Sequence, residues 1–125
     1  MKAMLIWFAA AVSVFATPLA GAADVLQSLN VMRRSYGLPP YLPDPRLAQG
    51  AETICHTMAR QGRSGHIGWH TRFGARAEGT GNRSITDPLG RRFYACYSAS
   101  RRFRYAGASA VVGRGGRTFY TLILR

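Results

Sequence analysis

Three side chains that can exchange protons or bind a metal ion lie near one another in the middle of the sequence. They are His66, His70 and Glu78. Imidazole titrates near neutral pH and is the commonest metal ligand, and a nearby carboxylate can orient it or share the metal. The group therefore predicts either a divalent-metal site, such as a zinc site with His66 as a ligand, or a histidine base oriented by Glu78.

A structural role is the competing interpretation, and we favour it. Zinc sites use at least three protein ligands, and His70 is the obvious third candidate beside His66 and Glu78. Without a metal, His66 would hydrogen-bond a carboxylate or a backbone group and stabilise an irregular loop. Glu78 also has three arginines nearby in the sequence, which favour a salt bridge: Arg72, Arg76 and Arg83.

The N-terminus has the pattern of a secretory signal peptide. Lys2 precedes an apolar run over residues 3–16, which Pro18 interrupts, and small residues occupy positions 20–23. A charged start, an apolar segment and a small-residue cleavage site are the three parts of such a signal. A membrane anchor is the alternative, but the run is shorter than the roughly 20 residues that span a bilayer.

We therefore predict a signal peptide over residues 1–23, cleaved after Ala22 or Ala23, and a single domain over residues 24–125. No later segment is apolar enough to cross a membrane. The two cysteines, Cys55 and Cys96, would then lie in an oxidising compartment, where an even number favours a disulfide. We predict that they form one, with two buried free thiols as the alternative.

Two helices are predicted in the first half of the domain. Asp24 is expected to cap a helix that runs to Tyr36 and ends at Gly37, and Asp44 with Pro45 begins another that Gly62 ends. Spacings of three and four place apolar residues on one face of each. These are Val25, Leu26, Leu29, Met32 and Tyr36 in the first, and Leu47, Ala51, Ile54, Cys55, Met58 and Ala59 in the second.

The second half is predicted to contain an irregular segment over residues 63–82, a third helix over 89–98 and a β-hairpin. Its strands, 106–113 and 118–124, flank the turn Arg114-Gly115-Gly116-Arg117. The last strand is apolar on both faces, so both faces must be covered. We expect an α+β fold, an α-β-α sandwich with a small antiparallel sheet between helical layers.

The sequence resembles the CAP superfamily, whose SCP domain is found in cysteine-rich secretory proteins, antigen 5 and plant pathogenesis-related proteins. The matching pieces keep the order found in that family and span nearly the whole mature chain. They are Gly37-Leu38-Pro39-Pro40, Asp44-Pro45-Arg46-Leu47, Met58-Ala59-Arg60-Gln61-Gly62, His66, Arg72, Ala77-Glu78-Gly79, Tyr105-Ala106-Gly107-Ala108 and Gly116-Arg117-Thr118-Phe119-Tyr120-Thr121. The resemblance implies an α-β-α sandwich, in agreement with the argument above.

The resemblance also implies a cleft with two histidines and two acids, which binds a divalent metal in some members. His66 and Glu78 match the first histidine and the first glutamate. Arg101 stands where the second histidine is expected, and the second acid is missing. We therefore predict a ligand-binding cleft of His66, His70, Glu78 and Arg101, assign no confident catalytic residue or cofactor, and lean against an enzyme.

Charge limits the choice of partner. The chain of 125 residues has a net charge of +12, with sixteen arginines and Lys2 against five acids. Such a protein is attracted to polyanions, but export argues against nucleic acid. We expect a secreted or periplasmic monomer that binds a lipid, a protein or an anionic envelope component. The alternatives are a hydrolase of peptide or cell-wall material and a general polyanion-binding protein.

Overall fold

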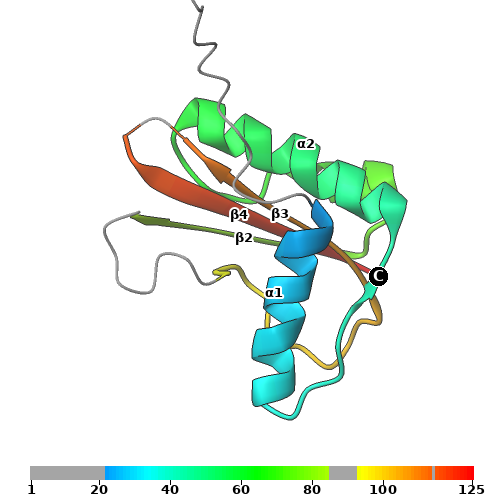
Figure 1. Cartoon of the computed structure of the whole chain (residues 1–125). Helices are drawn as coiled ribbons and strands as arrows, with labels where there is room; N and C mark the ends of the chain where they lie inside the picture. The colour runs from blue at the N-terminus through cyan, green and yellow to red at the C-terminus, as the bar shows by residue number, and fades with distance from the viewer. Residues whose placement is uncertain (1–21, 85–92, 114) are drawn as a thin grey trace, which may run out of the picture.

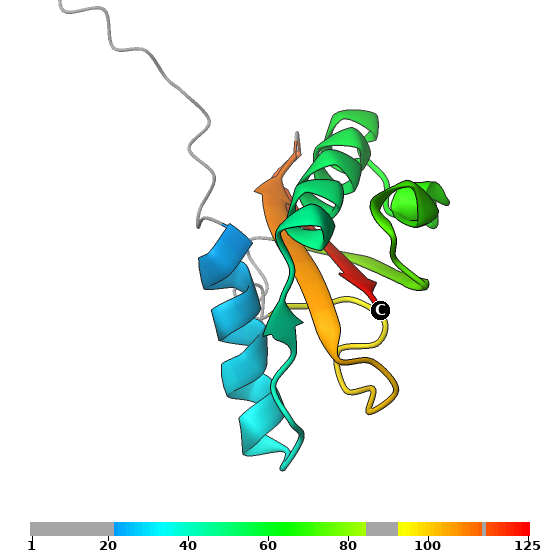
Figure 2. The same cartoon turned by 90° about the vertical axis from the view of Figure 1, so that its right-hand side faces the viewer.

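The computed structural model describes residues 22–84, 93–113 and 115–125, which form a four-stranded sheet with one helix on each face (Figures 1 and 2). Among these residues, no helix is long and apolar enough to cross a membrane. The predicted signal peptide lies outside this part of the chain apart from Ala22 and Ala23, so it stays a prediction. The elements are α1 (Ala22–Ser35), β1 (Leu42–Pro43), α2 (Pro45–Gln61), a 3-10 helix (Trp69–Phe73), β2 (Ala77–Ser84), β3 (Tyr105–Val112) and β4 (Arg117–Leu124).

The first helix starts earlier and ends earlier than predicted. Asp24 lies in the first turn of α1 and is not its cap, although a carboxylate there still favours the positive end of the helix. Tyr36 lies beyond the last helical residue, where the helical spacing no longer applies, and 66% of it is exposed. Gly37 follows with a φ of 71°, the left-handed conformation expected after a helix. The predicted apolar face is otherwise correct, because Val25, Leu26 and Leu29 are buried.

The second helix is confirmed at both ends. The Asp44 carboxylate accepts hydrogen bonds from the peptide N–H groups of Arg46 and Leu47, at 2.9 and 3.1 Å. Pro45 occupies the first turn, and Gly62 ends the helix with a φ of 72°. All six residues of the predicted apolar stripe are buried: Leu47, Ala51, Ile54, Cys55, Met58 and Ala59.

The sheet has the strand order β1-β3-β4-β2. The hairpin of β3 and β4 is confirmed, and β2 pairs antiparallel with the other side of β4. The prediction of a purely antiparallel sheet is wrong at one edge, because Leu42 and Pro43 of β1 pair parallel with β3. Two parallel strands need a connection that brings the chain back to the end of the sheet where the first strand began. Between β1 and β3, α2 and the segments after it form this connection.

Two hydrophobic clusters lie on opposite faces of the sheet. The residues of β4 alternate between them, and every residue from Thr118 to Leu124 is buried. Tyr120, Leu122 and Leu124 join the cluster beneath α1, whereas Phe119 and Ile123 join the cluster beneath α2. The prediction of a strand covered on both faces is thus confirmed, as is the α-β-α sandwich (Figure 2).

Strand β2 was not predicted, and the third helix was wrong where the structure describes it. Residues 93–100 contain turns and no helix, and residues 85–92 lie outside the described part. This segment crosses β2 closely: a Cβ on Gly79 would overlap the carbonyl group of Cys96, and one on Gly81 would overlap that of Tyr94. The glycines that suggest a loop are therefore strand residues that admit a second layer of backbone.

The predicted Cys55–Cys96 disulfide is also wrong, because both cysteines are free thiols on opposite faces of the sheet. Cys55 is buried in the cluster beneath α2, and its thiol donates to the Phe119 carbonyl oxygen at 3.1 Å. Cys96 is exposed and lies over Gly79, whose neighbour Glu78 points to the α2 side. An even cysteine count contains no information about the face of the sheet that each one occupies.

We expect a thiol reagent such as 5,5′-dithiobis(2-nitrobenzoate) to modify one cysteine in the native protein and two in urea. Cys96 is accessible, whereas burial raises the pKa of the Cys55 thiol to about 11 and keeps it protonated and shielded. Cys96→Ser should abolish the native reaction and Cys55→Ser should leave it unchanged. If neither cysteine reacted in denatured protein that had not been reduced, the assignment of Cys55 and Cys96 as free thiols would be wrong.

Candidate functional site

The candidate site lies where the chain passes from α2 to β2. Gly62 ends α2 and the next residues run across the α2 side of the sheet to the 3-10 helix. Strand β2 presents Glu78 on this side, opposite Ile123 of β4, whose side chain belongs to the cluster beneath α2. The site is therefore built from one loop, the 3-10 helix that follows it and one edge strand.

His66, His70 and Glu78 come together as predicted, and we call them the imidazole–carboxylate cluster. The Glu78 side chain is 1% exposed. Its Oε1 lies 3.7 Å from Nδ1 of His66, and its Oε2 lies 3.4 Å from Nδ1 of His70. The peptide N–H of Ile67 donates to Oε1 at 2.9 Å. A buried carboxylate needs such neighbours because its desolvation is costly, so Glu78 fastens the loop to β2.

The cluster does not match a zinc site. The two imidazoles approach different carboxylate oxygens, and the described part of the chain contains no group of three His, Cys, Asp or Glu side chains arranged to hold a metal ion. Zinc sites use at least three protein ligands around one point. Nδ1 of His70 and Oε2 of Glu78 are buried and have no hydrogen-bond partner among the described residues, so the 3.4 Å approach between them is not a hydrogen bond.

The expected salt bridge of Glu78 to a neighbouring arginine is absent among the described residues. Arg76 precedes β2, and its peptide N–H pairs with the Leu124 carbonyl oxygen. Arg83 lies on the opposite face of β2 from Glu78, where its guanidinium stacks on the ring of Tyr94 at 4.4 Å. Side chains alternate between faces along a strand, so closeness in sequence did not mean closeness in space.

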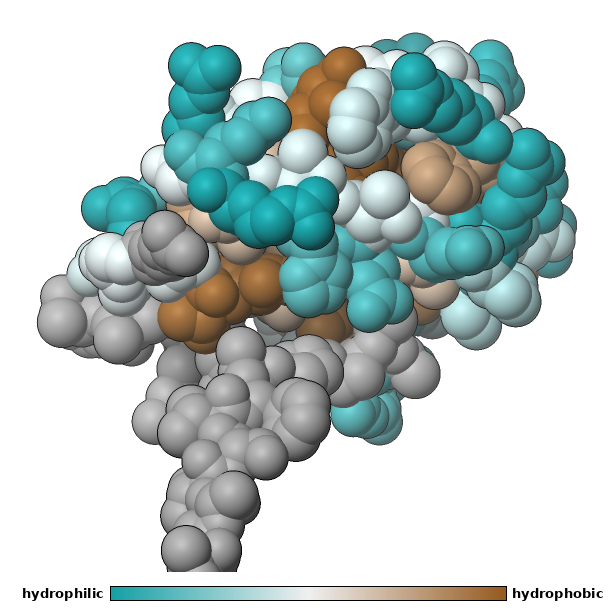
Figure 3. All heavy atoms as spheres, turned by 90° about the horizontal axis from the view of Figure 1, so that it is seen from above, coloured by the Kyte–Doolittle hydropathy of each residue, from teal (hydrophilic) through white to brown (hydrophobic). Residues whose placement is uncertain are grey.

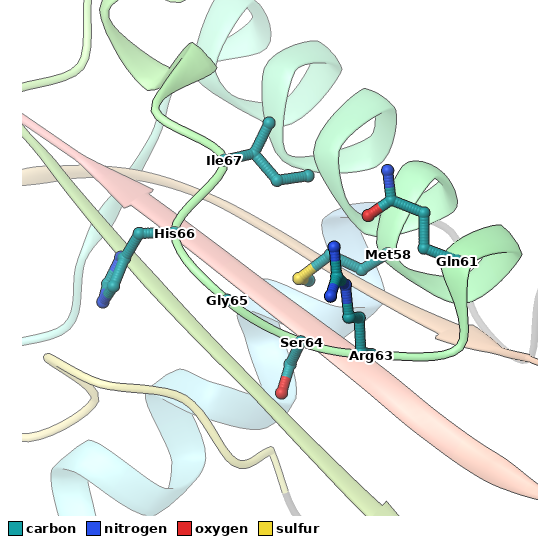
Figure 4. A pocket seen from close by; sticks show the side chains of 7 residues that line it. All are labelled: Met58, Gln61, Arg63, Ser64, Gly65, His66 and Ile67. Carbon is teal, nitrogen blue, oxygen red and sulfur yellow. The ribbon is translucent and has the colours of Figure 1, made fainter.

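A pocket of about 350 Å³ adjoins the cluster. Figure 4 shows its lining, with the Arg63 side chain near Met58 and the His66 ring pointing away from Arg63. The whole lining comes from the end of α2 and the loop after it: Met58, Gln61, Arg63, Ser64, Gly65, His66 and Ile67. His66 thus belongs both to the pocket wall and to the cluster.

Comparison with protein families agrees with this architecture. Residues 26–121 match the model of CAP, the cysteine-rich secretory protein family. The chain belongs to the CAP family. A comparison with curated proteins gave no match.

Within the CAP fold, Arg101 does not join the cluster. Arg101 and Glu78 form no ion pair in the described structure, and the charge of Arg101 acts instead on Arg33 of α1. Burial, and to a lesser extent Arg101, lowers the pKa of the Arg33 guanidinium. Of the four residues predicted to form a ligand-binding cleft, His66, His70 and Glu78 therefore lie together and Arg101 lies elsewhere, and ligand binding by them stays a prediction.

Two features of this CAP site were not recognised in the sequence. The Ile67 peptide N–H is the shortest contact to Glu78, but a backbone donor leaves no trace in residue types. The second feature is Arg63, which lines the pocket. The sequence held one sign of it: Arg63 directly follows Gly62, and the position of a residue just after a helix is fixed by the end of that helix.

Proposed function

We propose that this CAP domain acts outside the cytoplasm as a non-catalytic module that binds an anionic component of the cell envelope. The observation that carries the proposal is the imbalance of charge on its surface. Family membership, the signal-like N-terminus and the site geometry support different parts of it.

Among the described residues, the acids contact histidines more often than arginines. Asp44 pairs with Arg125 at 2.7 Å, Glu52 with His56 at 3.7 Å, and Glu78 contacts the two other histidines. Arg125 is therefore the one arginine in an ion pair between described residues. Figure 3 shows hydrophilic side chains over much of the face seen from above, with small hydrophobic areas between them. Excess positive charge at a surface attracts anionic polymers and lipid headgroups.

The state of Glu78 supports a binding role over a catalytic one. Its side chain is 1% exposed and already accepts a peptide hydrogen bond, so it does not face a substrate. The cluster is not arranged to hold a metal ion, and neither is any other group of three His, Cys, Asp or Glu side chains among the described residues. The cluster shapes the loop and leaves recognition to the groups around it.

A hydrolase is the second candidate, and His66 favours it. Its side chain is 63% exposed, lines the pocket and lies 3.7 Å from a buried carboxylate. An accessible imidazole backed by a carboxylate is the arrangement of a general base with its orienting partner. The substrate would be peptide or cell-wall material. Hydrolysis of either that disappears in His66→Ala would establish this candidate.

We expect the purified protein to bind vesicles that contain phosphatidylglycerol and not to bind vesicles of phosphatidylcholine alone. Affinity should fall about tenfold between 50 and 200 mM NaCl, because salt screens surface charges. Sedimentation of the protein with vesicles measures both effects, and His66→Ala should bind like the wild type. Absence of binding to any anionic vesicle at low salt would refute the membrane form of the proposal.

A further inference from the structure

Arg63 lies at the wall of the pocket and has no side-chain partner among the described residues. Its guanidinium forms no hydrogen bond, ion pair or aromatic contact with any other described residue, in contrast to Arg33, Arg46 and Arg125. A guanidinium offers five N–H donors in a planar fork that matches the oxygens of phosphate. Arg63 therefore has its donors available where the surface is hollowed (Figure 4).

The next three residues add backbone donors to the same wall. Ser64, Gly65 and His66 line the pocket, and none of their peptide N–H groups donates to another described residue. The flanking N–H groups are used: that of Arg63 bonds to the Met58 carbonyl oxygen and that of Ile67 to Glu78. Peptide N–H groups that no protein acceptor uses can donate to a bound anion.

The loop that presents these donors is held at both ends and in the middle. Gly62 and Glu78 fix its ends through the contacts described above. In the middle, the Asn82 amide donates to the Ser64 hydroxyl, and Arg117 donates to the Asn82 side-chain oxygen at 2.7 Å. A loop that is already ordered loses little entropy on binding, so its donors are available at low cost. This chain of bonds also brings a second arginine close to the pocket.

The rest of the lining is the polar Gln61 and the apolar Met58 and Ile67. Met58 is fully buried and Ile67 is partly buried, and both belong to the cluster beneath α2 or pack against it. A ligand that fills the pocket would thus meet the Arg63 guanidinium, the Gln61 amide and the apolar side chain of Ile67. No acidic side chain lines the pocket, and the nearby Glu78 carboxylate is buried and accepts a hydrogen bond from the Ile67 peptide N–H.

We propose that this pocket binds the phosphate group of an amphiphile, with Arg63 and the free peptide N–H groups of residues 64–66 donating to the phosphate and Ile67 against the attached chain. This assignment rests on the proposed function and gives the anionic ligand a specific site. A lipid headgroup and a free phosphate share this chemistry, and the apolar contact distinguishes them.

Hexyl phosphate and inorganic phosphate are suitable soluble probes, followed by amide chemical shifts and by calorimetry. Hexyl phosphate should shift the amide signals of residues 64–66 and bind about tenfold more tightly than inorganic phosphate, because its methylene groups become buried. Arg63→Gln should weaken the binding of hexyl phosphate at least about tenfold. Arg34→Gln, which removes the same charge from an exposed site on α1, should change the affinity less than about twofold.

Each other outcome overturns part of the assignment. Equal affinity for hexyl phosphate and inorganic phosphate would show that the attached chain is not bound. Equal losses of affinity in Arg63→Gln and Arg34→Gln would show that the ligand is attracted by the overall surface charge and not bound in the pocket. If wild-type protein binds anionic vesicles but hexyl phosphate shifts no amide of the loop, the pocket is refuted and the proposed function stands. If hexyl phosphate binds at the loop but vesicles do not, the membrane partner is refuted instead. Unchanged urea midpoints of both variants would show that folding is intact.

Discussion

Replacing Arg33 with methionine is expected to lower the free energy of unfolding by about 4 kcal/mol. Arg33 is 1% exposed, although no carboxylate pairs with it among the described residues. Its guanidinium donates to the carbonyl oxygens of Pro39 and Ser98, both at 2.9 Å, and lies 3.6 Å from the centre of the Tyr41 ring. Methionine fills similar space but leaves both carbonyl oxygens without this donor, and it loses the cation–π contact.

The effect should be large because Arg33 joins segments that are far apart in sequence. It links the end of α1 to the chain before β1 and to the turn at Ser98. The same turn accepts a hydrogen bond from the Tyr41 hydroxyl, which donates to the Tyr97 carbonyl oxygen at 2.7 Å. Arg33 and Tyr41 therefore hold residues 97–100 together, and loss of one weakens the contacts of the other.

Urea unfolding followed by tryptophan fluorescence measures the change. Arg34→Met is the matched control, because Arg34 is the exposed neighbour on the same helix and should cost less than about 0.5 kcal/mol. Arg33→Lys should recover only part of the loss, since an ammonium lacks the planar fork that reaches two carbonyl oxygens at once. Equal stabilities of the Arg33 and Arg34 variants would refute this role.

Arg33 also illustrates the limit of helical spacing as a source of burial predictions. The pattern identified Val25, Leu26 and Leu29 correctly because apolar side chains at those spacings have one favourable environment. It could not identify a buried arginine, since the carbonyl groups that accept its hydrogen bonds come from residues 39 and 98. Such burial depends on tertiary partners and leaves no local pattern.

Helix α2 and strand β2 show the same distinction between local and distant causes. The signals for α2 lie inside the element, in Asp44, Pro45 and Gly62, and its bounds were predicted. Strand β2 has the sequence AEGTGNRS, without the apolar alternation of a half-buried strand. It is a strand because all eight of its residues pair with β4, and its glycines accommodate the segment around Cys96.

The candidate site was predictable in part for the same reason. His66, His70 and Glu78 are close in sequence, and one loop and the following strand suffice to bring them together. Arg101 was placed in the site by resemblance alone, and its position depends on the segment after residue 92, where the helix prediction also failed. The unpaired state of Arg63 is a property of its surroundings, which the sequence does not display.

Gly107→Ala is expected to destabilise the protein by about 3 kcal/mol or more, through overlap between two backbones. Gly107 lies in β3 on the side of α2, and a Cβ there would overlap the peptide group that joins Leu47 to Ala48. Neither partner can yield by a side-chain rotation, because both are backbone within regular elements. The first turn of α2 would have to move away from the sheet, and Leu47, which is fully buried, would lose contacts with Ile123 in its cluster.

Gly65→Ala is the matched control for Gly107→Ala. No heavy atom lies within 4 Å of the position that its Cβ would take, and its backbone is not left-handed, so its effect should stay within about 0.5 kcal/mol. Urea unfolding of the two alanine variants tests the difference. Equal stabilities would mean that α2 shifts on the sheet without cost, and the close approach of helix and strand would then not constrain position 107. A large loss in Gly107→Ala alone would show that this contact fixes α2, and with it the start of the loop that forms the pocket.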